Sequence, residues 1–369
     1  MADQHPPQTP VQAQRAQEAA GRYTRAGLWL QVILLVLLAL EPWLVSSFRV
    51  MDVAAKVMIF AVLVASYDLL LGYTGIFSLA HAMFFGLGAY SLALIIHHAG
   101  APLWYHLPLA ALLATGLAVL VSLVVAFFSL RLKALFFVVM TLALAQFADI
   151  LSIQWHSLTR GEDGVSFKLP GLLDVGWSGG KLWGLTVNGR LLTYYIVLAA
   201  AALLFVGLVR FVRSPAGRVL KSIRDNEQRA TALGYKTFNY QILANVFGAV
   251  VASLCGVLYA LWVRFVGPES VMSTAIMLNI LLMLIIGGMG TLYGSIVGAA
   301  FILVAESWLA DGLRAVKVFL PDLMVLQRLA DRWILYFGVL FVLVVIFFPK
   351  GLVGSAREIA ARRRARVRE

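Results

Sequence analysis

Residues 53–71 read VAAKVMIFAVLVASYDLLL, an almost wholly apolar stretch. About 20 predominantly apolar residues are needed for a helix to cross the hydrocarbon core of a bilayer. Blocks of this kind, roughly 18–23 residues long, recur along the chain. Backbone groups in lipid must be paired within the segment, so we expect each block to be a helix. A transmembrane β-barrel would show short segments of alternating polarity instead, and the sequence has none.

The composition agrees with a membrane protein. The 369 residues are 61% hydrophobic and 13% charged, whereas soluble domains are about 45–50% apolar and about 25% charged. The net charge of +12 does not indicate nucleic-acid binding, because the basic residues lie at the ends of the apolar blocks. A single cysteine, Cys255, excludes an intrachain disulfide. The predicted fold class is therefore an all-α, polytopic transmembrane helix bundle.

About ten spans are predicted. They cover, in chain order, Leu28–Val45, Val53–Leu71, Leu79–His97, Leu107–Leu130, Ala134–Ile153, Leu191–Phe211, Tyr240–Val263, Ala275–Ile286, Thr291–Leu309 and Trp333–Phe348. The two short spans that flank Gly288 either cross the membrane or re-enter it. The apolar run of the first span ends at Glu41-Pro42 rather than at a small-residue cleavage site, so we expect this span to be retained.

The basic residues also predict an orientation, with both termini cytoplasmic. Residues 1–27 are interpreted as a disordered cytoplasmic tail, 28–350 as the transmembrane domain and 351–369 as a basic cytoplasmic tail. Residues 212–239 and the loop Arg131–Lys133 then face the cytoplasm. Residues 154–190 form a periplasmic loop, and the loop Asp311–Asp331 faces the same side.

The segment 212–239 has the pattern of two short helices. Ser214 can cap a helix that has Pro215 at its first position. A second helix is expected over Asn226–Leu233, with Gly234 ending it. Two amphipathic helices in a cytoplasmic loop are typical of a docking element for a soluble partner. The alternative is a basic loop that lies on anionic lipid headgroups.

The stretch Gly72–Tyr90 is rich in small residues. Gly72 and Gly75 permit a tight turn or a broken helix. One face of the following helix carries only small side chains, namely Ser78, Ala82, Gly86 and Ala89. His81 lies on the same helix. Either this helix packs closely, with His81 hydrogen-bonded inside the bundle, or it lines the translocation path and moves during gating.

A similar pattern occurs late in the chain, at Ile286–Gly298. Gly288 and Gly290 lie in a glycine turn, and Gly290, Gly294 and Gly298 form two consecutive steps of four residues. Glycine-interrupted segments in both halves can indicate a transport path and an ancient duplication. Close helix packing explains the glycines equally well.

Polar residues within the spans are further candidates, because burying them in lipid is costly. They are Asp68, Thr141, Gln146, Asp149, Asn245, Asn279 and Glu306. Each either makes an interhelical hydrogen bond or contacts the substrate. They form no continuous chain of buried acids or histidines, which argues against an ion-driven mechanism. The sequence also has no catalytic motif, no metal-ligand pattern and no phosphate-binding loop, so any ATP must be bound by another chain.

Taken together, the motifs resemble the permease subunits of branched-chain amino-acid ABC importers, specifically the M-type subunits of the LivM family. The resemblance covers residues from Val53 to Gly354. It rests on the motifs at Gly72–Tyr90, Thr159–Gly164, Ser214–Gly234, Gly287–Gly294 and Phe348–Leu352. Two positions depart from the family pattern. Ala80 and Arg160 each stand where glycine is common, and both are expected to stiffen their turns.

The resemblance implies a role and a set of partners. The chain would be a non-enzymatic subunit in the bacterial inner membrane, paired with an H-type permease, two cytoplasmic ATPase subunits and a periplasmic solute-binding protein. ATP and Mg would be held by the ATPase subunits and no cofactor by this chain. Branched-chain amino acids are the expected cargo, with urea, short amides, or aromatic or dicarboxylic acids as alternatives. A stand-alone secondary transporter and a membrane-embedded enzyme are the other classes considered.

The resemblance and the motifs together give two sets of candidate residues. The ATPase-coupling loop comprises Arg218, Lys221, Arg224, Asp225, Glu227, Ala230, Ala232 and Gly234. The candidates for the translocation path or its gate are Gly72, Gly75, Ser78, His81, Thr141, Gln146, Asn279, Gly288 and Gly290.

Overall fold

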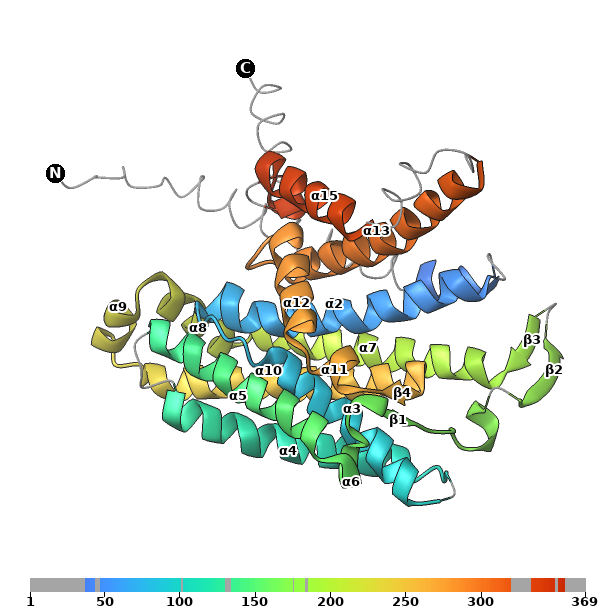
Figure 1. The fold of residues 1–369 in the computed structure, drawn as a ribbon. Coiled ribbons are helices and arrows are strands. Elements are labelled where there is room, and N and C mark those ends of the chain that lie inside the picture. The colour runs from blue at the N-terminus through green and yellow to red at the C-terminus, as the bar shows by residue number, and fades with distance from the viewer. Residues whose placement is uncertain are drawn as a thin grey trace. The chain divides into compact units, whose positions relative to one another are not determined.

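Long helices form where the apolar blocks lie (Figure 1). The computed structural model describes residues 37–43, 47–100, 102–129, 134–174, 176–182, 185–319, 333–348 and 351–355. The chain divides into two units, Met1–Ser47 and Phe48–Glu369, and the elements named below belong to the second. The predicted N-terminal tail, most of the first span, the loop Arg131–Lys133 and most of the C-terminal tail lie outside the described residues.

Nine long helices follow one another in the described part of the second unit. They are α2 (Phe48–Thr74), α3 (His81–His98), α4 (His106–Ser129), α5 (Ala134–Gln154), α7 (Gly189–Arg213), α10 (Thr237–Val263), α12 (Thr274–Gly287), α13 (Leu292–Phe319) and α15 (Trp333–Phe347). Their bounds agree with the predicted spans to within a few residues, except at α13. There a loop was predicted from Asp311, but the helix continues to Phe319. That prediction was wrong because Leu313 and Val316 keep an apolar helical spacing among the charged residues.

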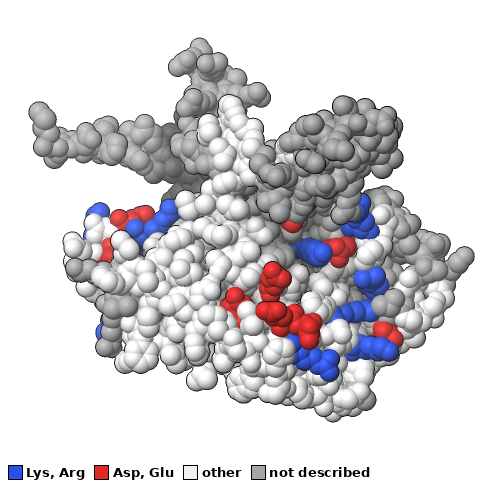
Figure 2. All heavy atoms as spheres, in the orientation of Figure 1, with Lys and Arg blue, Asp and Glu red and all other residues white. Residues whose placement is uncertain are grey.

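Seven helices in the described residues have the length and hydropathy needed to cross a membrane. They cover Phe48–Thr74, His106–Phe128, Leu135–Gln154, Gly189–Arg213, Thr237–Val263, Pro268–Gly287 and Leu292–Leu309. The chain is therefore an all-α, polytopic membrane protein, and the number of about ten spans stays a prediction. On the face shown in Figure 2, charged residues gather over α8 and α9 at one end and around α11 toward the other, with an uncharged band between them.

The core of the bundle lies along α2 and α10. Most of α2 is buried, whereas α4 and α5 expose large apolar side chains such as Leu112 and Leu135. Such exposure is expected of helices that face lipid or another membrane subunit. Helices α3 and α10 approach closely because Gly88 and Gly256 lack side chains. A Cβ on Gly88 would lie 1.7 Å from the carbonyl oxygen of Ser253.

The predicted small-residue face of α3 needs a correction. The helix begins at His81, so Ser78 lies before it and not on it. Gly86 faces Met272, and a Cβ there would lie 2.1 Å from Met272 Cγ. The close approach to α10 is made by Gly88, which is not one of the four residues of the predicted face.

Residues 154–190 are more ordered than a simple polar loop. They contain α6 (His156–Thr159), the 3-10 turns η1 (Gly161–Asp163) and η2 (Gly171–Leu173), and the strands β1 (Val165–Ser166), β2 (Ser178–Leu182) and β3 (Leu185–Asn188). Strand β2 pairs with β3. Strand β1 pairs antiparallel with β4 (Phe265–Val266), which follows α10. The sequence did not predict these strands, because two-residue strands carry no periodic signal.

Candidate functional site

The predicted pair of short helices is confirmed as α8 (Pro215–Asp225) and α9 (Glu227–Ala232). The Ser214 side chain caps α8 by accepting a hydrogen bond from the Gly217 N–H at 3.3 Å. The Asn226 side chain caps α9 by accepting from the Arg229 N–H at 2.9 Å. Leu220 and Ile223 are buried and hold α8 against the ends of the long helices. The two helices are thus fixed to the bundle and not free-standing.

Arg224, near the end of α8, connects this pair of helices to the end of α2. Its Nη1 donates a hydrogen bond to the carbonyl oxygen of Gly72. This carbonyl lies in the last turn of α2, where C=O groups have no partner within the helix. Gly75 ends the turn with a φ of +77°, and a Cβ there would lie 3.5 Å from Arg224 Cγ. Arg224 therefore lies directly against the first glycine turn.

Asp68 connects the same end of α2 to the late glycine turn between α12 and α13. Its buried carboxylate accepts a hydrogen bond from the Gly290 N–H at 2.7 Å. Gly290 has a φ of +78°, a conformation that favours glycine. Gly72 lies between the two, and a Cβ on it would come within 1.9 Å of Asp68 Oδ1 and 2.5 Å of the Gly290 nitrogen. The contact exists only because residue 72 has no side chain.

These five residues, Asp68, Gly72, Gly75, Arg224 and Gly290, form what we call the glycine junction. It joins α2, α8 and the turn between α12 and α13 at one end of the bundle. A further segment reaches the same turn. A Cβ on Gly351, which has a φ of +72°, would lie 2.4 Å from the Cα of Gly288. Four of the five motifs quoted from the sequence therefore meet at this end.

Two cavities flank the junction. The Lys221 cavity, of about 360 Å³, is bordered by α7, α8, the end of α2 and the start of α13. The Arg224 cavity, of about 610 Å³, is bordered by α5, α8 and the segment Thr74–Phe77. At the edge of the Arg224 cavity, Gln241 of α10 donates a hydrogen bond to Glu227 Oε1 at 3.1 Å. Of the other residues predicted for the coupling loop, Arg218 lines the Lys221 cavity, Ala230 is buried, and Asp225, Ala232 and Gly234 are exposed.

The remaining candidates for the path lie away from the junction. His81 is buried, and its Nε2 lies 2.8 Å from Ser66 Oγ. Thr141 Oγ1 accepts a hydrogen bond from the Leu79 N–H at 3.1 Å.

Two of the path candidates lie on α5 and α12, where the bundle surface is partly open. Gln146 of α5 donates a hydrogen bond to Thr274 at the start of α12. Asn279 of α12 is half-buried. The polar residue Asn245, also singled out from the sequence, makes an interhelical hydrogen bond to the Ser122 carbonyl at 3.1 Å.

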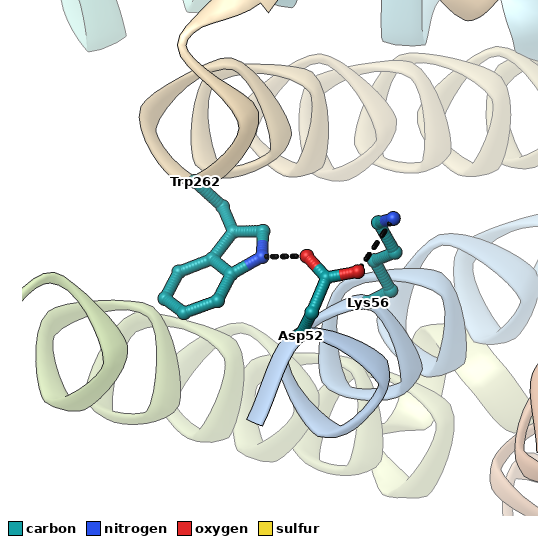
Figure 3. A network of polar contacts seen from close by, with 3 residues as sticks. All are labelled: Asp52, Lys56 and Trp262. Carbon is teal, nitrogen blue, oxygen red and sulfur yellow. Dashed lines mark hydrogen bonds and ion pairs between the residues drawn. The ribbon is translucent and has the colours of Figure 1, made fainter. Parts of the chain in front are cut away.

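A polar network at the opposite end of the bundle was missed by the sequence analysis (Figure 3). Asp52 accepts a hydrogen bond from Trp262 Nε1 at 2.8 Å and pairs with Lys56 Nζ at 2.8 Å. Near it, the Arg190 guanidinium lies 3.7 Å from the centroid of the Phe48 ring. The only sequence signal was the spacing of Asp52 and Lys56, four residues apart on one helix.

Arg264 fastens residues 154–190 to the end of α10 at this same end. Its Nη2 donates a hydrogen bond to the Leu173 carbonyl at 2.7 Å, and the Phe167 N–H bonds to the Arg264 carbonyl at 3.2 Å. Burial lowers the pKa of Arg264; repulsion from Arg190 adds to this shift and Asp174 opposes it. An arginine stays charged despite such a shift, so the contact persists at all physiological pH values.

Comparison with known proteins gives consistent relatives. The family described as the permease component of branched-chain amino acid transport systems matches residues 49–348. The high-affinity branched-chain amino acid permease protein LivM of Escherichia coli K12 is 29% identical over 81% of this chain and 72% of its own length. LivM of Salmonella typhimurium is 28% identical, covering 84% of this chain and 74% of the relative. The autoinducer 2 import permease LsrC of Escherichia coli O157:H7 is 27% identical, over 52% of this chain and 55% of its own length. No solved structure matches significantly.

Proposed function

We propose, since this chain belongs to the family of branched-chain amino acid transport permease components, that it is one of two permease subunits of an ATP-driven importer. The second subunit is an H-type permease, and the two chains enclose the translocation path between them. A periplasmic binding protein delivers branched-chain amino acids, and two cytoplasmic ATPase subunits bind the ATP and Mg. The support is the family match and the two LivM relatives that cover most of the chain.

The observation that carries the mechanism is the glycine junction. We take the end of the bundle with α8 and α9 as the cytoplasmic side, and these two helices as the surface on which an ATPase subunit docks. A displacement of α8 acts on α2 through the Arg224–Gly72 hydrogen bond. The displacement is passed on to the α12–α13 turn through the Asp68–Gly290 hydrogen bond. Because both bonds end on backbone atoms, they move helix ends and not only side chains.

The path itself is proposed to run along the α5 and α12 side of the bundle. Gln146 and Asn279 lie within spans there and are only partly buried, although polar groups exposed to lipid are costly. A second permease subunit on this side would remove these side chains from lipid and leave them bordering the path. Their amide groups match a solute that carries both an ammonium and a carboxylate group.

The test is to purify the chain with its ATPase subunits and H-type permease and to measure ATP hydrolysis stimulated by the loaded binding protein. Arg224→Gln is expected to lower the stimulated rate by about 10- to 100-fold, since a hydrogen bond from a charged group contributes about 1.5–3 kcal/mol. Arg224→Lys should restore part of the rate.

The matched control is Arg210→Gln in the last turn of α7, which removes an exposed charge of the same type outside the junction and outside α8 and α9. The proposal fails if Arg224→Gln and Arg210→Gln leave equal stimulation. Uptake of labelled leucine, with autoinducer 2 as a second cargo because of the LsrC relative, then identifies the solute. Uptake of solute by this chain without its ATPase subunits would show that the chain is a secondary transporter.

A further inference from the structure

The residues that line the Lys221 cavity include more positive charge than docking to an ATPase subunit requires. Three cationic side chains border its volume of about 360 Å³, Arg213 from the last turn of α7 and Arg218 and Lys221 from α8. None of the described residues that line it is acidic. The three cationic side chains are exposed, so solvent screens their mutual repulsion, and together they make the electrostatic potential at the cavity positive. The cavity is therefore suited to a negatively charged group.

The polar groups of the lining also favour an anion. Tyr293 lines this cavity, and its hydroxyl is shielded from solvent and has no hydrogen-bond partner among the described residues. A buried hydroxyl without a partner costs free energy, so a ligand oxygen at this position would relieve that cost. Residues 290–293 at the start of α13 form one wall, where the Gly290 N–H already donates to Asp68 Oδ1. Lys221 Nζ lies 5.0 Å from the centroid of the Tyr73 ring, which borders the same cavity.

The surroundings point to an amphiphilic ligand and not to a free anion. Val206 is exposed on α7, on the same helix face as Val209 and Arg213, which border the cavity. Leu203, one turn earlier, is 72% exposed. An apolar strip on a spanning helix thus ends at a cationic cavity, at the C-terminal end of the span Gly189–Arg213. This arrangement matches a glycerophospholipid, with its acyl chains on α7 and its phosphate among the cations.

We infer that the Lys221 cavity binds the phosphate headgroup of an anionic phospholipid, held by Arg213, Arg218, Lys221 and the Tyr293 hydroxyl. The lipid then bridges α7, α8 and the start of α13. It lies next to the glycine junction and braces α8. The inference rests on the membrane location of the chain and is independent of the cargo.

The experiment uses the purified full-length chain in detergent and measures bound lipid by native mass spectrometry. The probes are dioleoylphosphatidylglycerol, dioleoylphosphatidylcholine and sodium phosphate. The test variant combines Arg213→Gln, Arg218→Gln and Lys221→Gln. The control variant combines Arg210→Gln, Arg229→Gln and Lys236→Gln, which removes three exposed charges that do not line the cavity. Thermal unfolding without added lipid checks that both variants fold.

Phosphatidylglycerol should bind the wild-type chain and the control variant with similar affinity and bind the test variant about 100-fold more weakly. Tyr293→Phe, which removes one hydroxyl and keeps the ring, should weaken binding by about fivefold. Phosphatidylcholine should bind more weakly than phosphatidylglycerol to the wild-type chain.

Two results would overturn the inference. One is binding of phosphatidylglycerol to the test variant as tightly as to the control variant. The other is competition by sodium phosphate at equal concentration, which would indicate a site for free phosphate. Because the assay uses this chain alone, its outcome is separate from that of the transport test.

Discussion

Gly72 has the closest contacts within the glycine junction. The Asp68 carboxylate, the Gly290 N–H and the Arg224 guanidinium all lie around it, and the first two occupy the space that a methyl group would need. Gly72 also lies in the last turn of α2, where helix propensity favours alanine over glycine. The close approach of the two turns therefore outweighs helix propensity at this position.

Gly72→Ala should destabilise the protein by about 1–3 kcal/mol, because the new methyl group forces the two turns apart. Gly207→Ala is the matched control, since it lies in the interior of α7 and a Cβ there meets nothing within 4 Å. That control should be neutral or slightly stabilising. Thermal unfolding in detergent measures both changes. Equal effects of the two substitutions would contradict the packing described for the junction.

Asp68 should act mainly as a hydrogen-bond acceptor for the Gly290 N–H. Asp68→Ala leaves that N–H buried without its partner and should cost about 1–3 kcal/mol of unfolding free energy. Asp68→Asn retains an acceptor oxygen and should cost less than half as much. Denaturant unfolding compares the two, with Asp225→Ala, an exposed acidic residue of α8, as the control. If the asparagine variant is as unstable as the alanine variant, the carboxylate charge and not the acceptor is what matters.

Single residues were predicted from the sequence with uneven success. Ser214 and Asn226 were identified as the residues at the helix starts, because capping depends on local sequence. Asp68 was singled out as a polar residue in a span, but its partner Gly290 lies 222 residues further on. Nothing local connects the two. The same holds for Arg224, whose bond to Gly72 was not predicted although both residues were candidates.

At the scale of elements, a turn in residues 154–190 shows how the backbone conformation determines the effect of a substitution on stability. Arg160 ends α6 with a φ of 59°, in the left-handed region that favours glycine. The sequence analysis identified this position as one where glycine is common, and the conformation gives the reason. Arginine was expected to stiffen this turn, and the structure shows that the arginine there has a strained backbone conformation.

Arg160→Gly should therefore stabilise the protein by roughly 1 kcal/mol, because the left-handed conformation costs a non-glycine residue about that much. The neighbouring Gly161→Ala should do the opposite. Gly161 has a φ of +58°, and a Cβ there would lie 2.6 Å from His156 Nε2. Thermal unfolding of the two variants should shift in opposite directions. A loss of stability in Arg160→Gly would indicate a contact of the arginine side chain that outweighs the strain.

Element boundaries were the most predictable part of the fold. The spans were found because about 20 apolar residues bounded by charges or glycines leave few alternatives in a membrane. The extension of α13 was missed because its last turns mix charged and apolar residues. The pairing of β1 with β4 was missed because it joins Val165 to Val266, which are about a hundred residues apart and show no local pattern.

For the whole molecule, the predicted orientation is directly testable with cysteines. Cys255 is buried, so the native chain should react little with a membrane-impermeant maleimide. In a Cys255→Ala background, Lys168→Cys should be labelled in intact spheroplasts. Asp225→Cys should be labelled only after the membrane is opened; both positions are exposed in the structure. Labelling of both cysteines from outside, or the reverse pattern, would contradict the orientation.

How the motifs assemble was the least predictable feature of the whole molecule. The sequence identified each glycine-rich or basic segment separately and suggested two explanations for most of them. Only the folded chain shows that Gly75, Arg224, Gly290 and Gly351 lie at one end of the bundle. Periodicity assigns each segment to a helix or a turn, but it contains no information about which turns meet.

The long separations within the glycine junction also determine when it can form during synthesis. Asp68 and Gly290 are 222 residues apart in the chain, and Arg224 follows Gly72 by 152 residues. At ribosomal rates of about 5–20 residues per second, the Asp68 carboxylate waits roughly 10–40 seconds for its partner. During that interval α2 has been synthesised, but its C-terminal end lacks the hydrogen bond from Gly290. Asp68 therefore lacks its Gly290 partner until most of the chain has been translated.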